Sequence, residues 1–263
     1  MQKGRLVGRG ARSDIYEWGK GRVLKLMKPG ISLDAAKNEA RNTDLAFAAG
    51  LPVPRVYEVI EMEGRPGIVY EHIKGDPVDR HIKAATWRTG EFARQAAEVH
   101  TRVHQITVAG LRDVKHRLRS AVLRSKLGEA VQGQVLQRLQ GLPDGTALLH
   151  FDFHPLNLVL SGQRIYIIDW DNACTGDPLA DVARTCLISS LAEYHVRPGL
   201  KRILVRHFSR VMRDEYVKRY AEISAKGTES LRHWISVVAA ARMAEGFAEE
   251  VEPLKCLAAA VSS

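Results

Sequence analysis

The stretch LLHFDFHPLNLVL, residues 148–160, carries the pattern that decides the fold. It contains two short apolar segments typical of buried strands, and polar residues interrupt them at His150, Asp152, His154 and Asn157. Another apolar run, 165–168, ends directly at Asp169. Polar side chains at the ends of buried strands are costly unless they have partners or a function. The pattern therefore predicts a functional site at these strand ends.

The turn SGQR (161–164) predicts a β-hairpin between the apolar segments on either side of it. A hairpin brings its strand ends back to one edge, so Asn157 and Asp169 can share one ion. Mg²⁺ prefers hard oxygen ligands and takes only one or two carboxylates from a protein. Phosphoryl transfer also needs a group that orients or deprotonates the acceptor hydroxyl. We therefore predict Asp152 as the catalytic base and Asn157 and Asp169 as the magnesium ligands.

The segments HFDFHPLN (150–157) and IIDWDNACTGDPLADVAR (167–184) together resemble the aminoglycoside phosphotransferase and choline-kinase-like family. The signature of that family is an H-x-D-x-x-x-x-N loop, then Asp-Trp, then Gly-Asp-Pro, and all three occur here in order. The resemblance implies an α+β, bilobal, protein-kinase-like fold. It implies a small β-rich nucleotide-binding lobe, residues 1–73, and a large helical lobe, residues 74–263, for catalysis and acceptor binding.

The same resemblance implies a nucleotide site in the small lobe. Lys25, in the strand RVLKLM, is similar to the lysine that contacts the nucleotide phosphates, and Glu39 to the glutamate that holds it. The turn GRGARS (8–13) resembles a glycine-rich phosphate loop whose third glycine is replaced by a serine. The segment YEHI (70–73) resembles the hinge that binds adenine through its backbone. The implied nucleotide-binding residues are Gly8, Gly10, Ser13, Lys25, Glu39, Glu71 and Ile73.

Periodicity predicts a β-β-β-α-β-β order in the N-terminal part. The strands are expected at 4–9, 14–18, 22–28, 55–62 and 66–71. The helix is expected at 32–50, capped by Ser32 and stopped by Gly50, with a buried stripe of Leu33, Ala36, Ala40 and Phe47. The C-terminal part is predicted to be mostly helical, at 87–106, 111–127, 130–140, 178–192, 199–221, 228–250 and 254–261. In the first of these helices the predicted buried stripe is Phe92, Ala96, Val99 and Val103.

Composition narrows the class of protein. The chain has 263 residues, of which 45% are hydrophobic and 26% charged, as in globular proteins. No apolar run reaches the roughly 18 residues of a membrane span, and the start MQKGRLVGRG has no apolar signal core. We therefore expect a cytoplasmic protein without a membrane partner. Its three cysteines form no C-x-x-C pair.

The net charge of +9 is concentrated in the stretches 111–127 and 197–219. A basic face can bind nucleic acid, but a solvated helix face explains the same pattern. Neither an aromatic RNA-binding signature nor a zinc-finger spacing occurs, so nucleic acid is not expected as a partner.

For the acceptor, helical spacing after Trp234, Val238 and Ala241 places Glu245 on the same buried stripe, with Glu249 one turn further. We predict that both glutamates line the acceptor site and favour a hydroxyl compound bearing an amine. The alternative is that Glu245 forms an internal ion pair with an arginine, either Arg184 or Arg242.

Several residues near the motifs have structural roles as their first interpretation. His150 is expected to brace the loop, and Asp177, before Pro178, to cap a helix. Asp181 is a candidate brace of the loop, Asp171 a candidate extra carboxylate beside the metal, and His154 has no assigned role.

The predicted activity is transfer of the γ-phosphoryl group from ATP, with GTP as the alternative donor, to a hydroxyl of an aminoglycoside-, amino-alcohol- or sugar-like molecule. The oligomeric state is not predicted. One competing interpretation is a non-catalytic, kinase-like nucleotide-binding protein. Another is an iron site that uses the H-x-D pattern of His150 and Asp152.

Overall fold

The structure is a computed structural model that describes residues 3–224 and 227–260. The chain divides into two compact units: the first takes the residues up to Arg80 together with Pro155–Asn172, and the second takes His81–His154 and the residues from Ala173 onward. The segment 155–172 thus packs with the N-terminal unit, although a lobe of residues 74–263 was predicted. The functional division at 73/74 stays a prediction.

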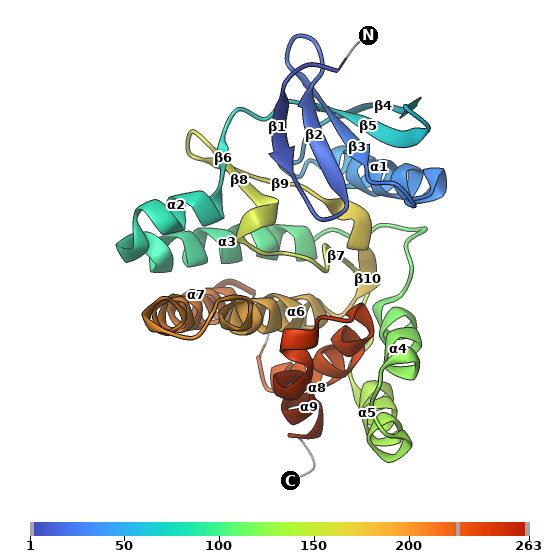
Figure 1. Cartoon of the computed structure of the whole chain (residues 1–263). Helices are drawn as coiled ribbons and strands as arrows, with labels where there is room; N and C mark the ends of the chain where they lie inside the picture. Colours follow the sequence, from blue (N-terminus) through green and yellow to red (C-terminus); the bar gives the residue numbers. More distant parts are fainter. Residues whose placement is uncertain (1–2, 225–226, 261–263) are drawn as a thin grey trace. The chain divides into compact units, whose positions relative to one another are not determined.

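The first unit is built on a five-stranded antiparallel sheet with the order β1-β2-β3-β5-β4. Its strands are β1 (Leu6–Arg9), β2 (Ser13–Glu17), β3 (Arg22–Met27), β4 (Val56–Met62) and β5 (Arg65–Glu71). Helix α1 (Leu33–Ala48) lies along this sheet (Figure 1). The predicted β-β-β-α-β-β order is confirmed.

Helix α1 begins and ends where the sequence predicts. The Ser32 hydroxyl accepts a hydrogen bond from the Ala35 N–H at 3.2 Å, and Gly50 has a φ of 79°, a left-handed conformation that favours glycine. The predicted buried stripe is only partly right. Ala36 and Ala40 are buried, but Leu33 and Phe47 are 40% and 44% exposed. The helix turns a partly polar face inward, with Glu39, Asn42 and Thr43 buried, so hydrophobicity alone misplaced the stripe.

Strand alternation places Lys25 on the face of the sheet that α1 covers. Met27 lies two residues further and packs in one cluster with Ala36 and Ala40 of α1. Leu24 and Leu26 point to the opposite face and pack with Trp18 and Val69. Because successive side chains of a strand point to opposite faces, Lys25 enters a largely apolar layer beside α1.

The first unit also contains the predicted hairpin. Strands β8 (Leu158–Ser161) and β9 (Arg164–Ile167) pair antiparallel around Gly162, and the short β6 (Asp76–Pro77) pairs with β8. The β8–β9 register places Leu158 opposite Ile167. The two chain segments that flank the hairpin, up to Asn157 and from Ile168 onward, therefore emerge side by side.

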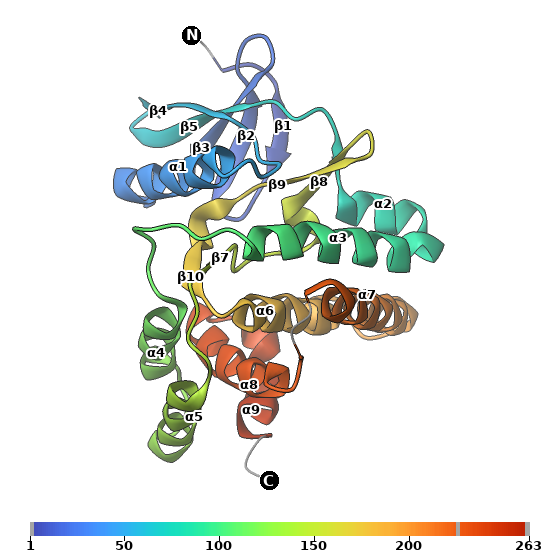
Figure 2. The same cartoon turned by 180° about the vertical axis from the view of Figure 1, so that it is seen from behind.

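The second unit is mostly helical. After α2 (Val78–Ala84), which spans the boundary, it contains α3 (Thr89–His104), α4 (Val114–Arg124), α5 (Glu129–Gly141), α6 (Pro178–Leu191), α7 (Leu200–Ser224), α8 (Leu231–Arg242) and α9 (Val251–Ala259). Figure 2 shows α4 and α5 as neighbours and α9 below α8. The predicted stripe of α3 (Phe92, Ala96, Val99 and Val103) is buried, as expected. A two-stranded sheet, β7 (Ala147–Leu149) and β10 (Cys174–Gly176), connects the helices.

Two predicted helices differ from the structure. The helix expected at 228–250 ends at Arg242, because a short 3-10 turn (Met243–Glu245) leads into Gly246 at a φ of 83°. A second 3-10 turn, Ala248–Glu250, leads into α9, which begins at Val251 and not at residue 254. Residue 261 of the predicted last helix lies outside the described residues. Within the described ranges, no helix combines the length and the apolarity that crossing a bilayer requires.

Candidate active site

The loop after β7 presents Asp152 through strict alternation of its side chains. Phe151 and Phe153 are 2% and 1% exposed, whereas the Asp152 side chain between them is 23% exposed. Phe151 adopts a left-handed φ of 60°, which bends the loop. The carboxylate of Asp181 in α6 holds this bend, because its two oxygens accept hydrogen bonds from the backbone N–H groups of His150 at 2.6 Å and Phe151 at 3.0 Å.

Asp152 is ionised at neutral pH. Burial opposes ionisation, but the contact with His154 and the charge of Arg184 outweigh it and lower the pKa of Asp152 to about 2. His154 Nε2 lies 3.6 Å from Asp152 Oδ2, and Arg184 Nη2 lies 4.0 Å from Oδ1. Such an acid is a weak base in the resting state. Its carboxylate is suited to orient a hydroxyl and to accept its proton as the oxygen is phosphorylated.

His150 contacts the backbone of its own loop, which fits the bracing role expected from the sequence. It is fully buried, and its Nδ1 accepts the Asp152 backbone N–H at 3.2 Å. This places its imidazole inside the fold and not at an open coordination site, which disfavours the iron interpretation.

In the first unit, Lys25 forms ion pairs with two carboxylates from distant parts of the chain. Its Nζ lies 2.7 Å from Glu39 Oε1 and 3.0 Å from Asp169 Oδ1. The Tyr70 hydroxyl donates to the same Glu39 oxygen at 2.9 Å. Burial opposes the charge of Lys25, yet the two carboxylates outweigh it and hold its pKa above the usual value. For Glu39 burial dominates and raises the pKa.

The backbone at the open end of the β8–β9 hairpin positions Asp169. The N–H of Ile168 donates to the Asn157 carbonyl at 3.0 Å, and Asp169 itself has a left-handed φ of 67°. Asn42 of α1 donates to the Trp170 carbonyl at 3.0 Å. Asp169 therefore leaves the strand with its side chain 41% exposed, and Asn157 is 7% exposed. An amide and a carboxylate oxygen at one hairpin end form a donor set of the hard type that Mg²⁺ prefers.

The glycine-rich turn and the hinge segment also lie in the first unit. The Gly10 N–H donates to the Ser13 carbonyl at 2.8 Å and closes the turn between β1 and β2, with Gly8 at its entrance and Ser13 buried. On the same turn, Arg12 forms an ion pair with Asp171, so this carboxylate has a side-chain partner.

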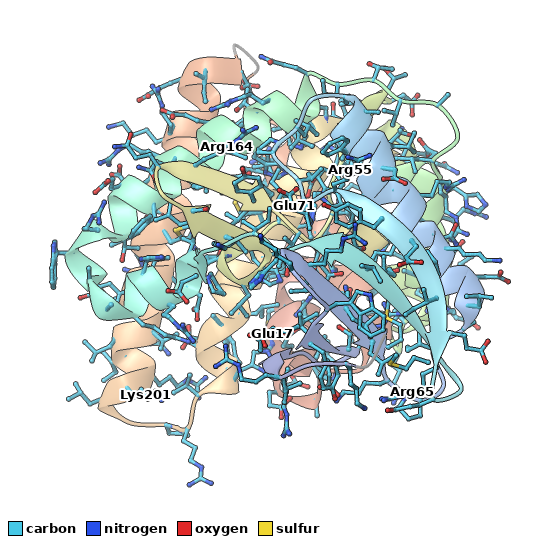
Figure 3. All side chains as sticks on the ribbon, turned by 90° about the horizontal axis from the view of Figure 1, so that it is seen from above. Glu17, Arg55, Arg65, Glu71, Arg164 and Lys201 are labelled. Carbon is cyan, nitrogen blue, oxygen red and sulfur yellow. The ribbon has the colours of Figure 1, made fainter. Side chains whose placement is uncertain are left out.

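In the hinge segment, Glu71 ends β5 beside Arg55 (Figure 3), where the Glu71 N–H donates to the Arg55 carbonyl at 2.9 Å. The next N–H, of His72, donates to the Gly21 carbonyl at 3.0 Å. Ile73 follows these two residues in a partly buried stretch without regular secondary structure.

Glu245 forms ion pairs with both arginines that the sequence offered as alternatives. Its Oε1 lies 2.5 Å from Arg184 Nη1, and its Oε2 lies 3.0 Å from Arg242 Nη1. Its side chain is 35% exposed and does not continue the buried stripe of α8, because that helix has already ended. Glu249 is exposed in the next 3-10 turn. The proposed contact of either glutamate with an acceptor stays a prediction.

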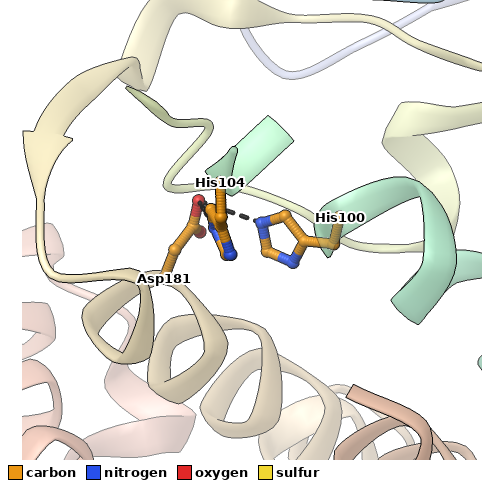
Figure 4. A group of neighbouring side chains, drawn as sticks. All are labelled: His100, His104 and Asp181. Carbon is orange, nitrogen blue, oxygen red and sulfur yellow. Dashed lines mark hydrogen bonds and ion pairs between the residues drawn. The ribbon is translucent and has the colours of Figure 1, made fainter. Parts of the chain in front are cut away.

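Sequence reasoning missed a buried polar cluster behind the Asp152 loop. Figure 4 shows His100 and His104, one turn apart on α3, directed toward Asp181 of α6. Their Nε2 atoms lie 3.0 and 3.4 Å from Asp181 Oδ2, and their Nδ1 atoms lie 2.6 and 2.8 Å from the hydroxyls of Tyr216 and Tyr220. The i,i+4 spacing of the two histidines on a buried helix was the available signal.

This cluster has the residue types of a metal site, but its hydrogen bonds give it another role. Burial of His100 and the nearby His104 lower the pKa of His100 to about 4, so its ring is neutral at pH 7. Burial opposes the ionisation of Asp181, yet its histidine partners lower its pKa well below the usual value. The anion accepts bonds from both rings and from the loop backbone, and so connects α3 and α6 to the segment that carries Asp152.

Comparison with known proteins identifies the class. The model of the APH phosphotransferase enzyme family matches residues 3–234, so the chain belongs to this family. A curated mouse protein, acyl-CoA dehydrogenase family member 10 of Mus musculus, is 25% identical over 186 residues, which are 59% of this chain. The match covers only 17% of that relative's length.

Solved structures support the same fold. A thermostable mutant of aminoglycoside phosphotransferase APH(4)-Ia in ternary complex with AMP-PNP and hygromycin B aligns with a TM-score of 0.66 at 16% identity, over 97% of this chain and 91% of the other. A choline/ethanolamine kinase family protein from Mesorhizobium loti aligns with a TM-score of 0.62 at 19% identity, over 98% and 84%. At these identities the likeness shows the fold alone, and it confirms the predicted protein-kinase-like fold.

Proposed function

We propose that this protein transfers the γ-phosphoryl group of ATP to a hydroxyl group of a small molecule. The observation that carries the proposal is the Lys25 cluster, in which one buried lysine joins a helix carboxylate, Glu39, and a strand-end carboxylate, Asp169, at 2.7 and 3.0 Å. Phosphoryl transfer needs a fixed cation that contacts the phosphates and a carboxylate that binds the metal ion. Membership of the phosphotransferase family and the nucleotide complexes of its structural relatives support the same chemistry.

In this mechanism Lys25 binds the phosphates, and Glu39 acts only by placing Lys25. Asn157 and Asp169 would hold Mg²⁺, which neutralises phosphate charge when bound. The turn with Gly8, Gly10 and Ser13 would cover the phosphates, and the backbone of Glu71 and Ile73 would bind the base. Among the described residues, none accepts a hydrogen bond from the Ile73 N–H, which leaves this group available for adenine.

Asp152 orients the acceptor hydroxyl and takes its proton as the bond between the γ-phosphorus and the bridging oxygen breaks, with ADP as the leaving group. The phosphorylated acceptor and ADP are the products. In this scheme residues 1–73 form the nucleotide-binding lobe, and residues 74–263 form the catalytic and acceptor-binding lobe.

The test is Asp152→Asn in an ATP-consumption assay with a panel of hydroxyl acceptors. The substitution should leave nucleotide binding nearly intact and reduce turnover by about two to four orders of magnitude, the usual range for a group that moves or positions a proton. Asp144→Asn is a matched control, because Asp144 is an exposed acid of the same unit that forms an ion pair with Lys115 at 2.7 Å. An Asp152→Asn variant with most of its activity would refute the assignment. An unmodified protein that binds ATP and turns over no acceptor would favour the non-catalytic alternative.

A further inference from the structure

Two arginines with little solvent exposure are fixed in the unit that carries Asp152. Arg184 donates from Nε to the Phe151 carbonyl at 3.2 Å, and its Nη2 lies 4.0 Å from Asp152 Oδ1. Arg242 donates from Nε and Nη2 to the fully buried Glu250, at 2.6 and 2.8 Å. The side chains of the two arginines are only 7% and 9% exposed. Both guanidinium groups are therefore held by contacts that a ligand would leave in place.

Glu245 bridges these arginines and is the least constrained member of the group. One of its oxygens contacts Arg184 and the other contacts Arg242. Its side chain is 35% exposed, and it ends a single 3-10 turn directly before Gly246, whose φ is 83°. A short turn beside a left-handed glycine constrains a side chain less than a helix interior does. Glu245 can thus move away while the arginines stay.

The charge of any molecule that takes the place of Glu245 decides whether the exchange is favourable. A partly exposed ion pair contributes little by itself. Leaving a buried guanidinium without an anion, however, is strongly unfavourable. Arg242 keeps Glu250 as a partner, whereas Arg184 would retain, among the described acids, only Asp152 at 4.0 Å. The exchange is therefore close to balanced for an incoming anion and costly for a neutral or cationic group.

We propose that the acceptor is a hydroxy acid whose carboxylate takes the place of Glu245 on Arg184 and Arg242 and whose hydroxyl faces Asp152. The Glu245 carboxylate, with one oxygen on each arginine, occupies the position of the ligand carboxylate. This inference rests on the proposed function and names its acceptor class. It replaces the amine-bearing acceptor expected from the sequence, because an amine at Glu245 would meet two guanidinium groups.

The experiment uses two sets of compounds that share a carbon skeleton and differ in charge. One set is glycerate, glyceramide and 3-amino-1,2-propanediol, and the other is gluconate, glucose and glucosamine. Binding to the full chain with a non-hydrolysable ATP analogue is measured by calorimetry, and turnover with MgATP is measured by ADP release. We expect the acids to bind at least about tenfold more tightly than their neutral and cationic counterparts, since a like charge or a lost charge partner disfavours the others.

The decisive variant is Glu245→Gln, which removes the competing carboxylate and preserves the shape of the side chain. We expect it to lower the Kd of the acids by about tenfold, because the ligand no longer competes with an internal anion. Glu193→Gln is the matched control. Glu193 also pairs with two arginines, Arg202 and Arg206, at 3.3 and 2.7 Å, and its substitution should leave the Kd unchanged.

The outcomes separate this inference from the proposed function. Acids that bind no better than the amide, sugar or amine, or a Glu245→Gln variant that weakens binding of the best acceptor, overturn the hydroxy-acid assignment. Turnover of an amine or a neutral sugar would do the same and leave the proposed function standing. Acids that bind as expected, with no member of either set phosphorylated, support the carboxylate site and count against phosphoryl transfer.

Discussion

Substitutions in the Lys25 cluster should lower the free energy of unfolding by different amounts. The ranking of the variants tests the reasoning as directly as the size of each loss. Lys25→Met removes the only cation that contacts Glu39 among the residues that the structure describes, and the Glu39 side chain is 4% exposed. Glu39→Gln instead leaves Lys25 with Asp169 at 3.0 Å, close to the 2.7 Å of the lost contact. At an effective dielectric constant of about 20, each contact is worth roughly 6 kcal/mol of Coulomb attraction before desolvation. Because water screens the Asp169 carboxylate, which is 41% exposed, Lys25 retains the smaller part of its attraction after Glu39→Gln.

The expected losses in the free energy of unfolding follow from this asymmetry. Lys25→Met should cost about 3–5 kcal/mol, the range for a buried charge left without its partner. Glu39→Gln should cost about 1–3 kcal/mol, because a second anion remains and the Tyr70 hydroxyl keeps an acceptor. The double variant should be more stable than Lys25→Met alone, since it buries no uncompensated carboxylate.

Urea unfolding at pH 7, monitored by circular dichroism, measures these differences. The exposed pair Arg94–Glu215, at 2.6 Å with side chains 50% and 35% exposed, is the control, and Arg94→Met should change stability by no more than about 1 kcal/mol. Losses that add within about 0.5 kcal/mol in the double variant, as for independent sites, would refute the reasoning. So would a Glu39→Gln variant less stable than Lys25→Met.

The pH dependence gives an independent check on the same cluster. Burial raises the pKa of Glu39 in the folded state, and removal of Lys25 should raise it further. The folded Lys25→Met protein then binds a proton that the unfolded chain releases above its ordinary pKa of about 4.5, so its stability must fall as the pH rises through this window. The double variant serves as the reference. If Lys25→Met loses more stability than this reference between pH 7 and pH 5, the assignment is wrong.

Three further predictions concern the strand-end acid and the buried cluster. Asp169→Asn, which keeps a residue that tolerates the left-handed φ of 67°, should abolish the Mg²⁺-dependent tightening of ATP binding in titrations with and without the ion; unchanged MgATP affinity would move the metal site elsewhere. Asp181→Asn should lower kcat and cost about 2–4 kcal/mol, because an amide places a donor among buried donors; a variant with normal kcat and stability would show that the brace is dispensable. The pKa of His100 lies at about 4 in the fold against 6.5 in the unfolded chain, so about 3 kcal/mol of stability should be lost as the pH falls from 6.5 to 4. The variant His100→Gln should reduce this loss, measured as urea midpoints over the same pH range. An equally steep decline in the variant would contradict a neutral buried ring.

The local signals of the sequence were sufficient for the order of the elements and for the motif residues. Ser32 and Asp177 cap the helices that they were predicted to cap, the latter accepting the Leu179 N–H at 2.8 Å. Turn residues and apolar alternation predicted the β8–β9 hairpin that sets Asn157 beside Ile168. Such features depend on residues a few positions apart, whose preferences act before any tertiary contact forms.

The tertiary structure decided which of the possible charge pairs form: Glu39 contacts Lys25, and Glu245 contacts both Arg184 and Arg242. Helix α1 leaves Leu33 and Phe47 exposed and buries Glu39 because of the surface that it packs against. The periodicity of the helix sequence does not show what that surface is. Glu245 illustrates the same limit. Sequence spacing continued its helix, whereas Gly246 ended the turn and the carboxylate reached Arg184, 61 residues away along the chain. The sequence determined which charged and polar side chains this protein has. Long-range packing determined which of them pair with one another, because the partners and the desolvation of a charge depend on its folded surroundings.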